Sequence, residues 1–335
     1  MRILGFQALP RSVVRMATLL AVLAALNGCA GLPTATPPGT VYIPAEDETF
    51  GRFAPLFVHE NDARAYNRIG RPVASYDERG DVSVYVDPLR PVIFTERREF
   101  ESSNGAHYTN LIYRVHFERV PVSFRPFHIS AGRNVGLLVI VTINEKQEPV
   151  LYTTVHTCGC YTAFVPTAFM SASARPTNWA EHEQEVWGEQ LPARLTLARP
   201  YDGGQRPLIT LRAGSHRVKD IGITTLPAAR SEFRSVVTAL APVSELKRLP
   251  IRDGTTISFF NTEGARAGYV RGTFKPFELL LVSWWSLDVR AGVDKEYGMP
   301  GDGGPRFHTS FRPWKRKTSD MRDFAGFLDY WGWHL

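Results

Sequence analysis

The sequence GLLVIVTINEKQEPVLYTTV, residues 136–155, contains the clearest secondary-structure signal in this chain. Apart from the first glycine, residues 136–143 are all aliphatic or β-branched, which is typical of a strand buried on both faces. Residues 144–147 are polar and indicate a turn, and the apolar pattern returns at residues 150–155. The two apolar segments are therefore predicted to pair as a β-hairpin near the centre of a sheet.

The segment before this hairpin also has the pattern of a strand. Residues 111–118 alternate in polarity, as expected for a strand with one apolar and one polar face. The apolar face carries Leu111, Tyr113, Val115 and Phe117, and the polar face carries Arg114, His116 and Glu118. Shorter strands are predicted at residues 82–86, 92–95, 208–211, 256–260 and 269–274. The chain therefore has enough strand segments to build a β-rich domain.

Helical patterns occur in fewer places. Residues 231–240 and the last segment of the chain, capped by Ser319 or Asp320, are predicted to be helices. Residues 277–285 fit either a buried helix or a buried strand. Residues 179–187 fit a short helix within a long surface excursion that is rich in proline and glycine.

The composition bounds the architecture. The 335 residues are 44% hydrophobic and 21% charged, which excludes a chain that is disordered throughout and a collagen. Three cysteines are too few for a disulfide-dense scaffold. No internal repeat or change in composition divides residues 45–335. The sequence therefore predicts a single α+β globular domain there, β-rich and mixed, with a C-terminal helix.

The N-terminus has the features of an export signal. Arg2, Arg11 and Arg15 give it a positive charge without any acidic residue, and residues 16–26 form an apolar run of 11 residues. Such a run is too short to cross a bilayer, which needs about 20 residues, but it has the length of a signal-peptide core. No later run is long enough to span a membrane.

The apolar run ends in Leu26-Asn27-Gly28-Cys29, which resembles the lipobox of bacterial lipoproteins. The resemblance implies that residues 1–28 are a lipoprotein signal peptide and that Cys29 is lipidated after cleavage. Because Ala30 stands where an Asp would favour the inner membrane, the resemblance implies the outer membrane, with the protein facing the periplasm. In an organism without an outer membrane, the cell membrane is expected. A plain secretory signal with a cysteine nearby is the alternative interpretation.

The predicted mature chain starts with a tether and carries a mild charge. Residues 29–44 contain the lipidated cysteine and a proline-rich stretch, which predicts an extended connection between lipid and domain. Loss of three of the 39 basic residues with the signal peptide leaves 36 against 33 acidic residues. Because this excess is small and no nucleic-acid-binding motif is found, nucleic acid is not an expected partner.

The clearest candidate for chemistry is His156-Thr157-Cys158-Gly159-Cys160, directly after the predicted return strand. If the strand continues, His156, Cys158 and Cys160 lie on one face, because side chains alternate along a strand. Two thiolates and an imidazole suit zinc or copper, with His116 or His128 as a further ligand. The same cysteines also fit a strained, readily reduced disulfide. An inert disulfide or a pair of buried thiols is the structural alternative.

A basic and aromatic segment, RFHTSFRPWKRK at residues 306–317, precedes the predicted C-terminal helix. Such a segment can lie on an anionic bilayer with tryptophan at the level of the headgroups, or bind an anionic glycan. The candidate contact residues are Arg312, Trp314, Lys315, Arg316 and Lys317. The alternative is a solvated loop before a helix that packs on the core. The mixed charges of residues 288–297 are predicted to be solvated surface.

The sequence favours a binding or structural role in the cell envelope. The membrane, through the N-terminal lipid, and an envelope protein or glycan are the expected partners. The alternative is a metal-dependent or thiol-redox enzyme centred on His156, Cys158 and Cys160. An enzyme predicts a pocket that brings His116 or His128 to this cluster, whereas a binding module predicts an exposed apolar or aromatic patch. A third class, a hydrolase, predicts two carboxyl groups about 5–9.5 Å apart in a cleft.

Overall fold

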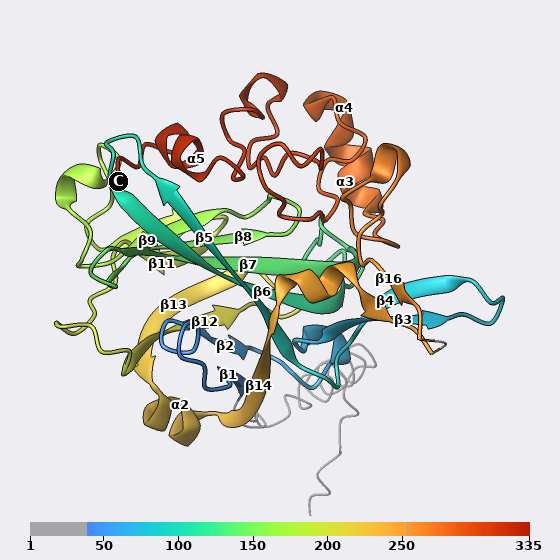
Figure 1. The fold of residues 1–335 in the computed structure, drawn as a ribbon, viewed down its shortest axis with the longest axis horizontal. Helices are drawn as coiled ribbons and strands as arrows, with labels where there is room; N and C mark the ends of the chain where they lie inside the picture. The colour runs from blue at the N-terminus through green and yellow to red at the C-terminus, as the bar shows by residue number, and fades with distance from the viewer. Residues whose placement is uncertain (1–38, 253) are drawn as a thin grey trace, which may run out of the picture. The chain divides into compact units, whose positions relative to one another are not determined.

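The computed structural model describes residues 39–252 and 254–335, and its main feature is one large curled sheet (Figure 1). Ten strands of these residues lie in the sheet in the order β13-β12-β2-β1-β14-β5-β6-β7-β8-β9. They are β1 (Thr40–Pro44), β2 (Leu56–His59), β5 (Val92–Glu101), β6 (His107–Val120), β7 (Gly132–Asn144), β8 (Pro149–His156), β9 (Ala163–Pro166), β12 (Gln205–Leu211), β13 (Val218–Thr225) and β14 (Arg234–Pro242). The predicted signal peptide, Cys29 and the predicted tether up to residue 38 lie outside the described residues. The prediction that the tether continues to residue 44 is wrong, because residues 40–44 form the buried strand β1.

Strand β14 joins the two halves of the sheet. Its first part runs parallel to β1 and its second part runs parallel to β5, whereas β5 to β9 pair in antiparallel order. The helix predicted over residues 231–240 is therefore wrong. The helix α2 (Leu226–Glu232) lies earlier and is capped by Thr225, whose hydroxyl accepts from the Ala228 N–H. The β-branched residues that follow α2 pair with two strands that are distant in sequence, which outweighs the local helical pattern.

The predicted hairpin is confirmed as the pair β7–β8, and β7 is buried from Asn134 to Ile143. Alternate residues of β6 and β7 contribute to two different cores. One core lies within the curl of the sheet and includes Leu111, Tyr113, Val115, Phe117, Leu137, Val139 and Val141. The other lies on the outer face and includes Ile112, Leu138, Ile140, Leu151 and Val155. The prediction of a central strand buried on both faces is therefore also confirmed.

The C-terminal part of the chain covers the outer face of the sheet. The side chains that pack there are Phe307, Met321, Phe324, Phe327, Leu328 and Trp333. Three of them lie on α5 (Phe324–Tyr330), which corresponds to the predicted C-terminal helix. Its cap is Asp323, whose carboxylate accepts from the Gly326 N–H, and not Ser319 or Asp320.

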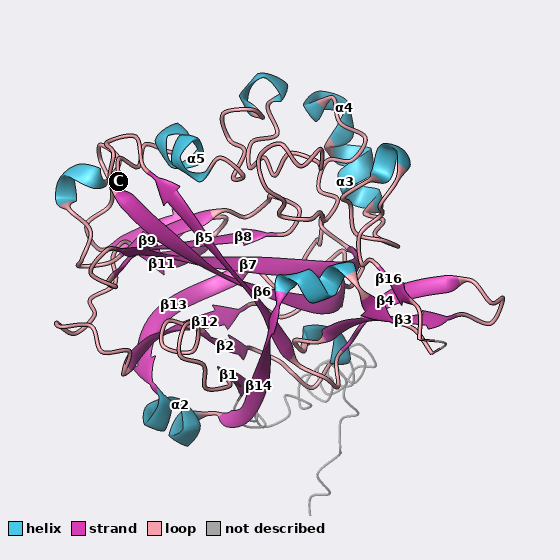
Figure 2. Cartoon of the chain, viewed as in Figure 1, coloured by secondary structure: helices cyan, strands magenta, loops and turns pink. Residues whose placement is uncertain are grey.

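The other elements are short (Figure 2). The small sheets pair β3 (Arg71–Tyr76) with β4 (Val82–Asp87), β10 (Glu183–Val186) with β11 (Glu189–Pro192), and β15 (Leu249–Pro250) with β16 (Thr256–Ile257). The short helices α3 (Pro276–Leu281) and α4 (Ser283–Ser286) lie over the outer face of the sheet. The helix predicted over residues 179–187 is wrong, since β10 lies there, and residues 269–274 form isolated bridges instead of a strand. No helix among the described residues is long and apolar enough to span a bilayer.

Candidate functional site

The segment from His156 to Cys160 is a closed turn and not a continued strand. Strand β8 ends at His156, whose N–H donates to the Cys160 carbonyl at 2.9 Å, and the Gly159 N–H donates to the His156 carbonyl at 2.8 Å. Gly159 has a φ of +90°, and a Cβ there would lie 2.2 Å from the His308 carbonyl oxygen. The premise that placed His156, Cys158 and Cys160 on one strand face is therefore wrong.

The two cysteines of this turn are buried, unbridged thiols. The Cys160 N–H donates to Cys158 Sγ at 3.2 Å. The hydrogen bond between the two thiols and then burial raise the pKa of Cys160 well above its usual value. Because the thiolate is the reactive and metal-binding form, this environment disfavours both chemistries at Cys160.

The histidines proposed as metal ligands each have a hydrogen-bond partner elsewhere. His156 Nε2 donates to the His216 carbonyl at 3.1 Å, and His128 Nδ1 donates to the Pro121 carbonyl at 3.0 Å. His116 Nε2 accepts from Arg114 Nε at 2.9 Å. Within residues 39–252 and 254–335, no three His, Cys, Asp or Glu side chains are arranged to hold a metal ion. The geometry does not bring the predicted zinc or copper ligands together.

Two further histidines, which the sequence did not single out, form a buried chain. His216 Nε2 donates to the Arg119 carbonyl at 2.9 Å, so its Nδ1 accepts from His59 Nε2 at 3.2 Å. Burial lowers the pKa of His216 to about 4 and that of His156 to about 3. These imidazoles are therefore neutral at pH 7. Their positions on separate strands and turns explain why sequence spacing did not group them.

A cluster of charged side chains is buried against the cysteine turn. Lys275 Nζ lies 2.8 Å from an Asp294 oxygen and 3.9 Å from Glu278, and the Thr157 hydroxyl donates to Asp294 at 2.5 Å. The backbone N–H of the buried Lys295 donates to the Thr157 carbonyl at 3.0 Å. The prediction that this charged run is solvated surface is therefore wrong for Asp294 and Lys295. The sequence signal for this arrangement was the polar face of β6. Arg114 lies on that face and donates to the Lys295 carbonyl.

The ionisation of this cluster follows from burial and pairing. Burial would lower the pKa of Lys275, but the carboxylates of Asp294 and Glu278 raise it well above its usual value. Burial raises the pKa of Glu278 to about 7, against the opposing effect of Lys275. These charged side chains thus hold α3 and residues 288–297 against the cysteine turn, which is a structural role.

In contrast to this buried cluster, α3 and α4 present apolar side chains to solvent. Leu280 and Trp284 are each 71% exposed, and Trp314 is 73% exposed. Residues 311–316 lie against α4, because Trp285 contacts the Phe311 ring at 5.9 Å between centroids and Arg316 donates to the Ser286 carbonyl. Residues 277–285 are thus helical, but the prediction that they are buried is wrong for most of them.

The exposed apolar surface continues onto the loop before β7. The rings of Phe124 and Phe127 pack on Phe277 of α3, with centroid distances of 5.8 and 5.2 Å. We refer to the following exposed side chains as the apolar face: Val122, Phe124, Phe127, Phe274, Leu279, Leu280, Leu281, Trp284, Trp285, Leu287, Val289 and Trp314. Because large exposed apolar patches are uncommon on soluble monomers, the apolar face is a candidate binding surface.

The predicted basic contact residues border the apolar face. Arg312, Lys315 and Lys317 are exposed on either side of Trp314. Arg316 is half-buried and already has partners in the protein, because it donates to the Ser286 carbonyl and lies 3.7 Å from Asp288. On the other side of the face, Arg125 and Arg133 are also exposed. The face therefore combines apolar and aromatic groups with a positively charged border.

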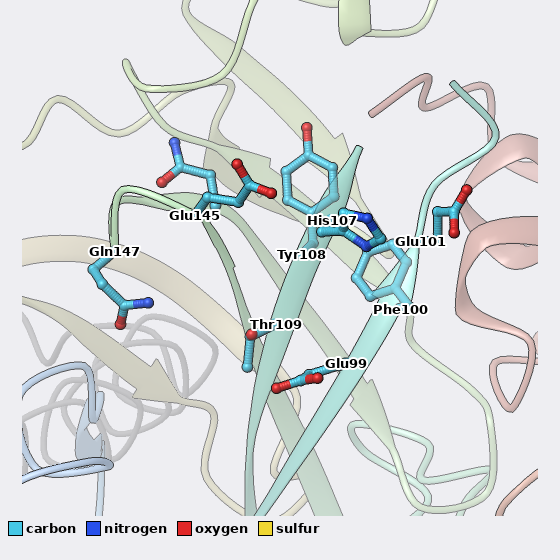
Figure 3. Close-up of a pocket in the computed structure, with 9 residues that line it drawn as sticks. Glu99, Phe100, Glu101, His107, Tyr108, Thr109, Glu145 and Gln147 are labelled. Carbon is cyan, nitrogen blue, oxygen red and sulfur yellow. The ribbon is translucent and has the colours of Figure 1, made fainter. Parts of the chain in front are cut away.

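The carboxylates that a hydrolase would need do not converge in the cavities described here. A cavity of about 440 Å³ at the ends of β5, β6 and β7 is lined by Glu99, Glu101 and Glu145. Figure 3 shows these side chains pointing in different directions. Arg97 also pairs with Glu99 at 2.8 Å. This cavity does not support the carboxylate-pair hypothesis.

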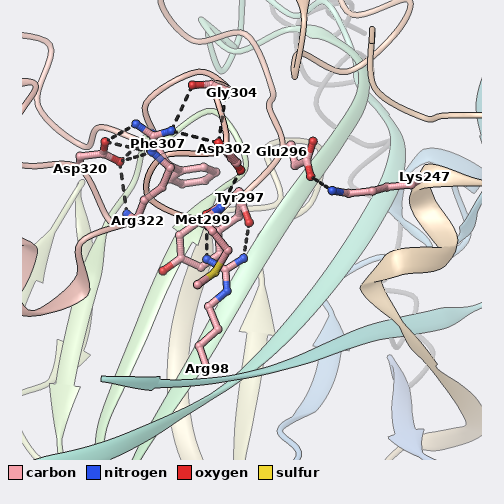
Figure 4. Close-up of polar contacts among 11 residues, drawn as sticks. Arg98, Lys247, Glu296, Tyr297, Met299, Asp302, Gly304, Phe307, Asp320 and Arg322 are labelled. Atoms are coloured by element: carbon pink, nitrogen blue, oxygen red, sulfur yellow. Dashed lines mark hydrogen bonds and ion pairs between the residues drawn. The ribbon is translucent and has the colours of Figure 1, made fainter. Parts of the chain in front are cut away.

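A smaller cavity, of about 180 Å³, lies under the loop of residues 296–304. Its charged groups are bonded to the loop or to each other (Figure 4). Arg98 donates to the Tyr297 and Gly298 carbonyls, and Lys247 pairs with Glu296 at 2.6 Å. These contacts fasten the loop to β5 and do not form a reaction site.

No protein family, curated protein or solved structure matches this chain. The choice between a binding module, a metal or redox enzyme and a hydrolase therefore rests on the arrangement of the described residues. The cysteine turn is buried and its partners are engaged, whereas the apolar face is exposed and has a basic border.

Proposed function

We propose that this chain is a lipid-anchored cell-envelope protein with a binding role, which docks its apolar face on an anionic membrane surface. The observation that carries the proposal is the exposure of Leu280, Trp284 and Trp314 beside Lys315 and Lys317. Lipidation at Cys29 and a position on the outer membrane, facing the periplasm, are the parts of the proposal that rest on the signal sequence.

The chemistry of the face suits a bilayer. Tryptophan is favoured at the level of the headgroups, and leucine is favoured in the acyl region below it. Burying one leucine or phenylalanine side chain contributes about 1.5–3 kcal/mol, and one lysine or arginine near an anionic surface contributes about 1 kcal/mol. Several such residues on one face are enough for reversible binding. The N-terminal lipid would then keep the face close to the membrane and raise its effective concentration.

The enzyme alternative has less support. A thiol-redox or metal-dependent enzyme centred on His156, Cys158 and Cys160 needs access to the thiols and free ligand atoms. The thiols are buried, and His156 is engaged with the His216 carbonyl. An envelope protein as the occupant of the apolar face is the alternative that failure of the parent chain to float would favour.

The experiment is flotation of residues 30–335 with phosphatidylcholine vesicles that contain or lack phosphatidylglycerol. Every described core residue lies within this range, so the segment contains the whole described unit, Gly39–Leu335. We expect the protein to float with the anionic vesicles and Leu280→Ser to weaken binding about tenfold or more. The matched control is Leu89→Ser, because Leu89 is 77% exposed but lies outside the apolar face. Equal effects of the two variants, or no flotation of the parent chain, would overturn the proposal.

A further inference from the structure

A second cavity of about 440 Å³ adjoins the apolar face. Phe127 belongs to both, since it lines the cavity and packs on Phe277 of α3. The far wall comes from the turn between β12 and β13, where Arg212, Ser215 and Arg217 line the cavity. A molecule that lies on the membrane side of the apolar face could therefore reach the cavity along Phe127.

The turn that carries the two arginines is firmly built. The Arg212 N–H donates to the Arg217 carbonyl at 2.9 Å, which fixes both ends of the turn. Gly214 has a φ of +77°, and a Cβ there would lie 2.7 Å from the His128 ring, so the turn approaches the opposite wall where only glycine fits. The backbone positions of Arg212 and Arg217 are thus fixed before any ligand arrives.

Positive charge exceeds negative charge around these groups. Arg212 donates to both oxygens of Glu189, at 2.6 and 2.5 Å, and Arg217 contacts the same carboxylate at 3.3 Å. Glu60 pairs with Lys219 at 2.6 Å and lies 3.8 Å from Arg212. Three cations therefore share two carboxylates, and the site carries one positive charge that these partners leave unbalanced. Both arginines are partly exposed, so a ligand can reach them.

The hydrogen-bonding groups of the cavity favour a ligand that accepts hydrogen bonds. The Glu189 carboxylate is already occupied by the two arginines. The Ser215 hydroxyl is buried and has no hydrogen-bond partner among the described residues. The Arg217 guanidinium lies 5.6 Å from the Tyr161 ring, and the Tyr161 hydroxyl is bonded to Ser130. Because Ser215 lines the cavity and its hydroxyl has no acceptor among the described residues, this hydroxyl is available to donate to a ligand there.

We infer that this cavity binds the phosphate group of an anionic lipid headgroup, with Arg212, Ser215 and Arg217 as the contacting residues. Guanidinium groups bind phosphate oxygens through short, charge-assisted hydrogen bonds, and the Ser215 hydroxyl would supply a further donor. The lipid source rests on the proposed membrane docking. The phosphate chemistry is common to a headgroup and to a free phosphate ester, so the two sources are separated by experiment.

The experiment measures inorganic phosphate binding and vesicle flotation for residues 30–335 and for Ser215→Ala and Arg217→Gln. We expect each variant to bind inorganic phosphate about tenfold more weakly and to lose the preference for vesicles with phosphatidylglycerol over phosphatidylcholine alone. The matched control is Thr154→Val, which removes another buried hydroxyl that has no hydrogen-bond partner among the described residues. Thr154→Val should keep both properties. Thermal unfolding of Ser215→Ala should be unchanged, because the lost hydroxyl bonds no group among the described residues.

Each outcome decides one part of the inference. Unchanged phosphate binding in both variants overturns the phosphate site. Weakened phosphate binding with an unchanged lipid preference overturns the lipid source and assigns the cavity to a free phosphate ester. If the parent chain binds phosphate through Ser215 but does not float, membrane docking fails while the phosphate site stands. Loss of both properties in the variants alone supports the headgroup assignment.

Discussion

Lys275 Nζ lies 2.8 Å from Asp294 Oδ2, and both side chains are buried against the turn that carries Cys158 and Cys160. This ion pair connects α3, which carries part of the apolar face, to residues 288–297 and through Thr157 to the end of β8. The exposed surface and the interior of the domain are therefore joined by a buried charge contact. Removal of this ion pair should therefore destabilise the C-terminal segments that cover the outer face of the sheet.

We predict that Lys275→Met lowers the free energy of unfolding by about 3–5 kcal/mol, because it leaves the Asp294 carboxylate buried without its cation. The measurement is urea unfolding at pH 7. Lys247→Met is the matched control, since Lys247 is 58% exposed and pairs with Glu296 at 2.6 Å. An exposed pair contributes at most about 1 kcal/mol. Similar losses in the two variants would contradict a stabilising role for the buried pair.

The buried histidines predict that acid destabilises the domain. The folded-state pKa values of His156 and His216, about 3 and about 4, lie below the unfolded value of about 6.5. A lowered folded pKa means that the unfolded chain binds more protons, so stability is present above pH 6.5 and is lost as the pH falls towards 4. Each histidine contributes a slope of up to about 1.4 kcal/mol per pH unit in this window.

Glu278 has the opposite sign and provides a check. Its folded pKa of about 7 lies above the unfolded value, so its contribution is present at low pH and is lost as the pH rises through 7. Glu278 therefore opposes the histidines between about pH 4.5 and pH 6.5. Urea unfolding at pH 7 and pH 5 should show a loss of stability on acidification, and Glu278→Gln should make this loss larger. A flat profile in both proteins would show that the imidazoles titrate normally.

The hairpin of residues 136–155 was predictable because its signal is local. A continuous aliphatic run, a polar turn and a second apolar run decide the pairing without information from the rest of the chain. Strand β14 was not predictable in this way. Residues 234–242 become a strand because β1 and β5, both distant in sequence, lie on either side of them. Tertiary pairing overrides a local helical pattern in such cases.

The candidate site was only partly predictable, for related reasons. The basic and aromatic residues at 312–317 could be read from composition, but their position beside Trp285 could not. Hydrophobicity alone made residues 277–285 look buried, since a sequence does not show which apolar faces lack a cover. Asp294 and Lys295 look like solvated surface until Thr157 and Lys275 are placed against them.

The cysteines give a prediction that separates a buried pair from a redox site. In residues 30–335, Cys158 and Cys160 are the two cysteines of the sequence. Because both are buried and the pKa of Cys160 is raised, we expect a maleimide to label the folded protein at least about 100-fold more slowly than the protein in urea. The measurement is a time course of intact mass at pH 7. Rapid labelling of the folded protein would instead favour the thiol-redox alternative.

The length of the tether should control how well a lipidated chain docks. Strand β1 begins at Thr40, which pairs with Arg234 directly after α2, and this end of the sheet lies away from α3 and α4 (Figure 1). If the ten residues from Cys29 to Pro38 were fully extended in a polyproline-like form, they would span about 31 Å. A domain of this size has a radius of gyration of about 19 Å, so tether and domain are of comparable length.

We therefore predict that inserting ten Gly-Ser residues after Pro38 increases membrane contact of the apolar face in the lipidated protein. Quenching of tryptophan fluorescence by brominated lipid in reconstituted vesicles measures this contact, because Trp284 and Trp314 would reach the headgroup region. The same insertion should not change the quenching of residues 30–335 without lipid, because the tether of that protein is not anchored to the membrane. Equal quenching with the short and the long tether would mean that anchor and face already engage the same bilayer without restraint.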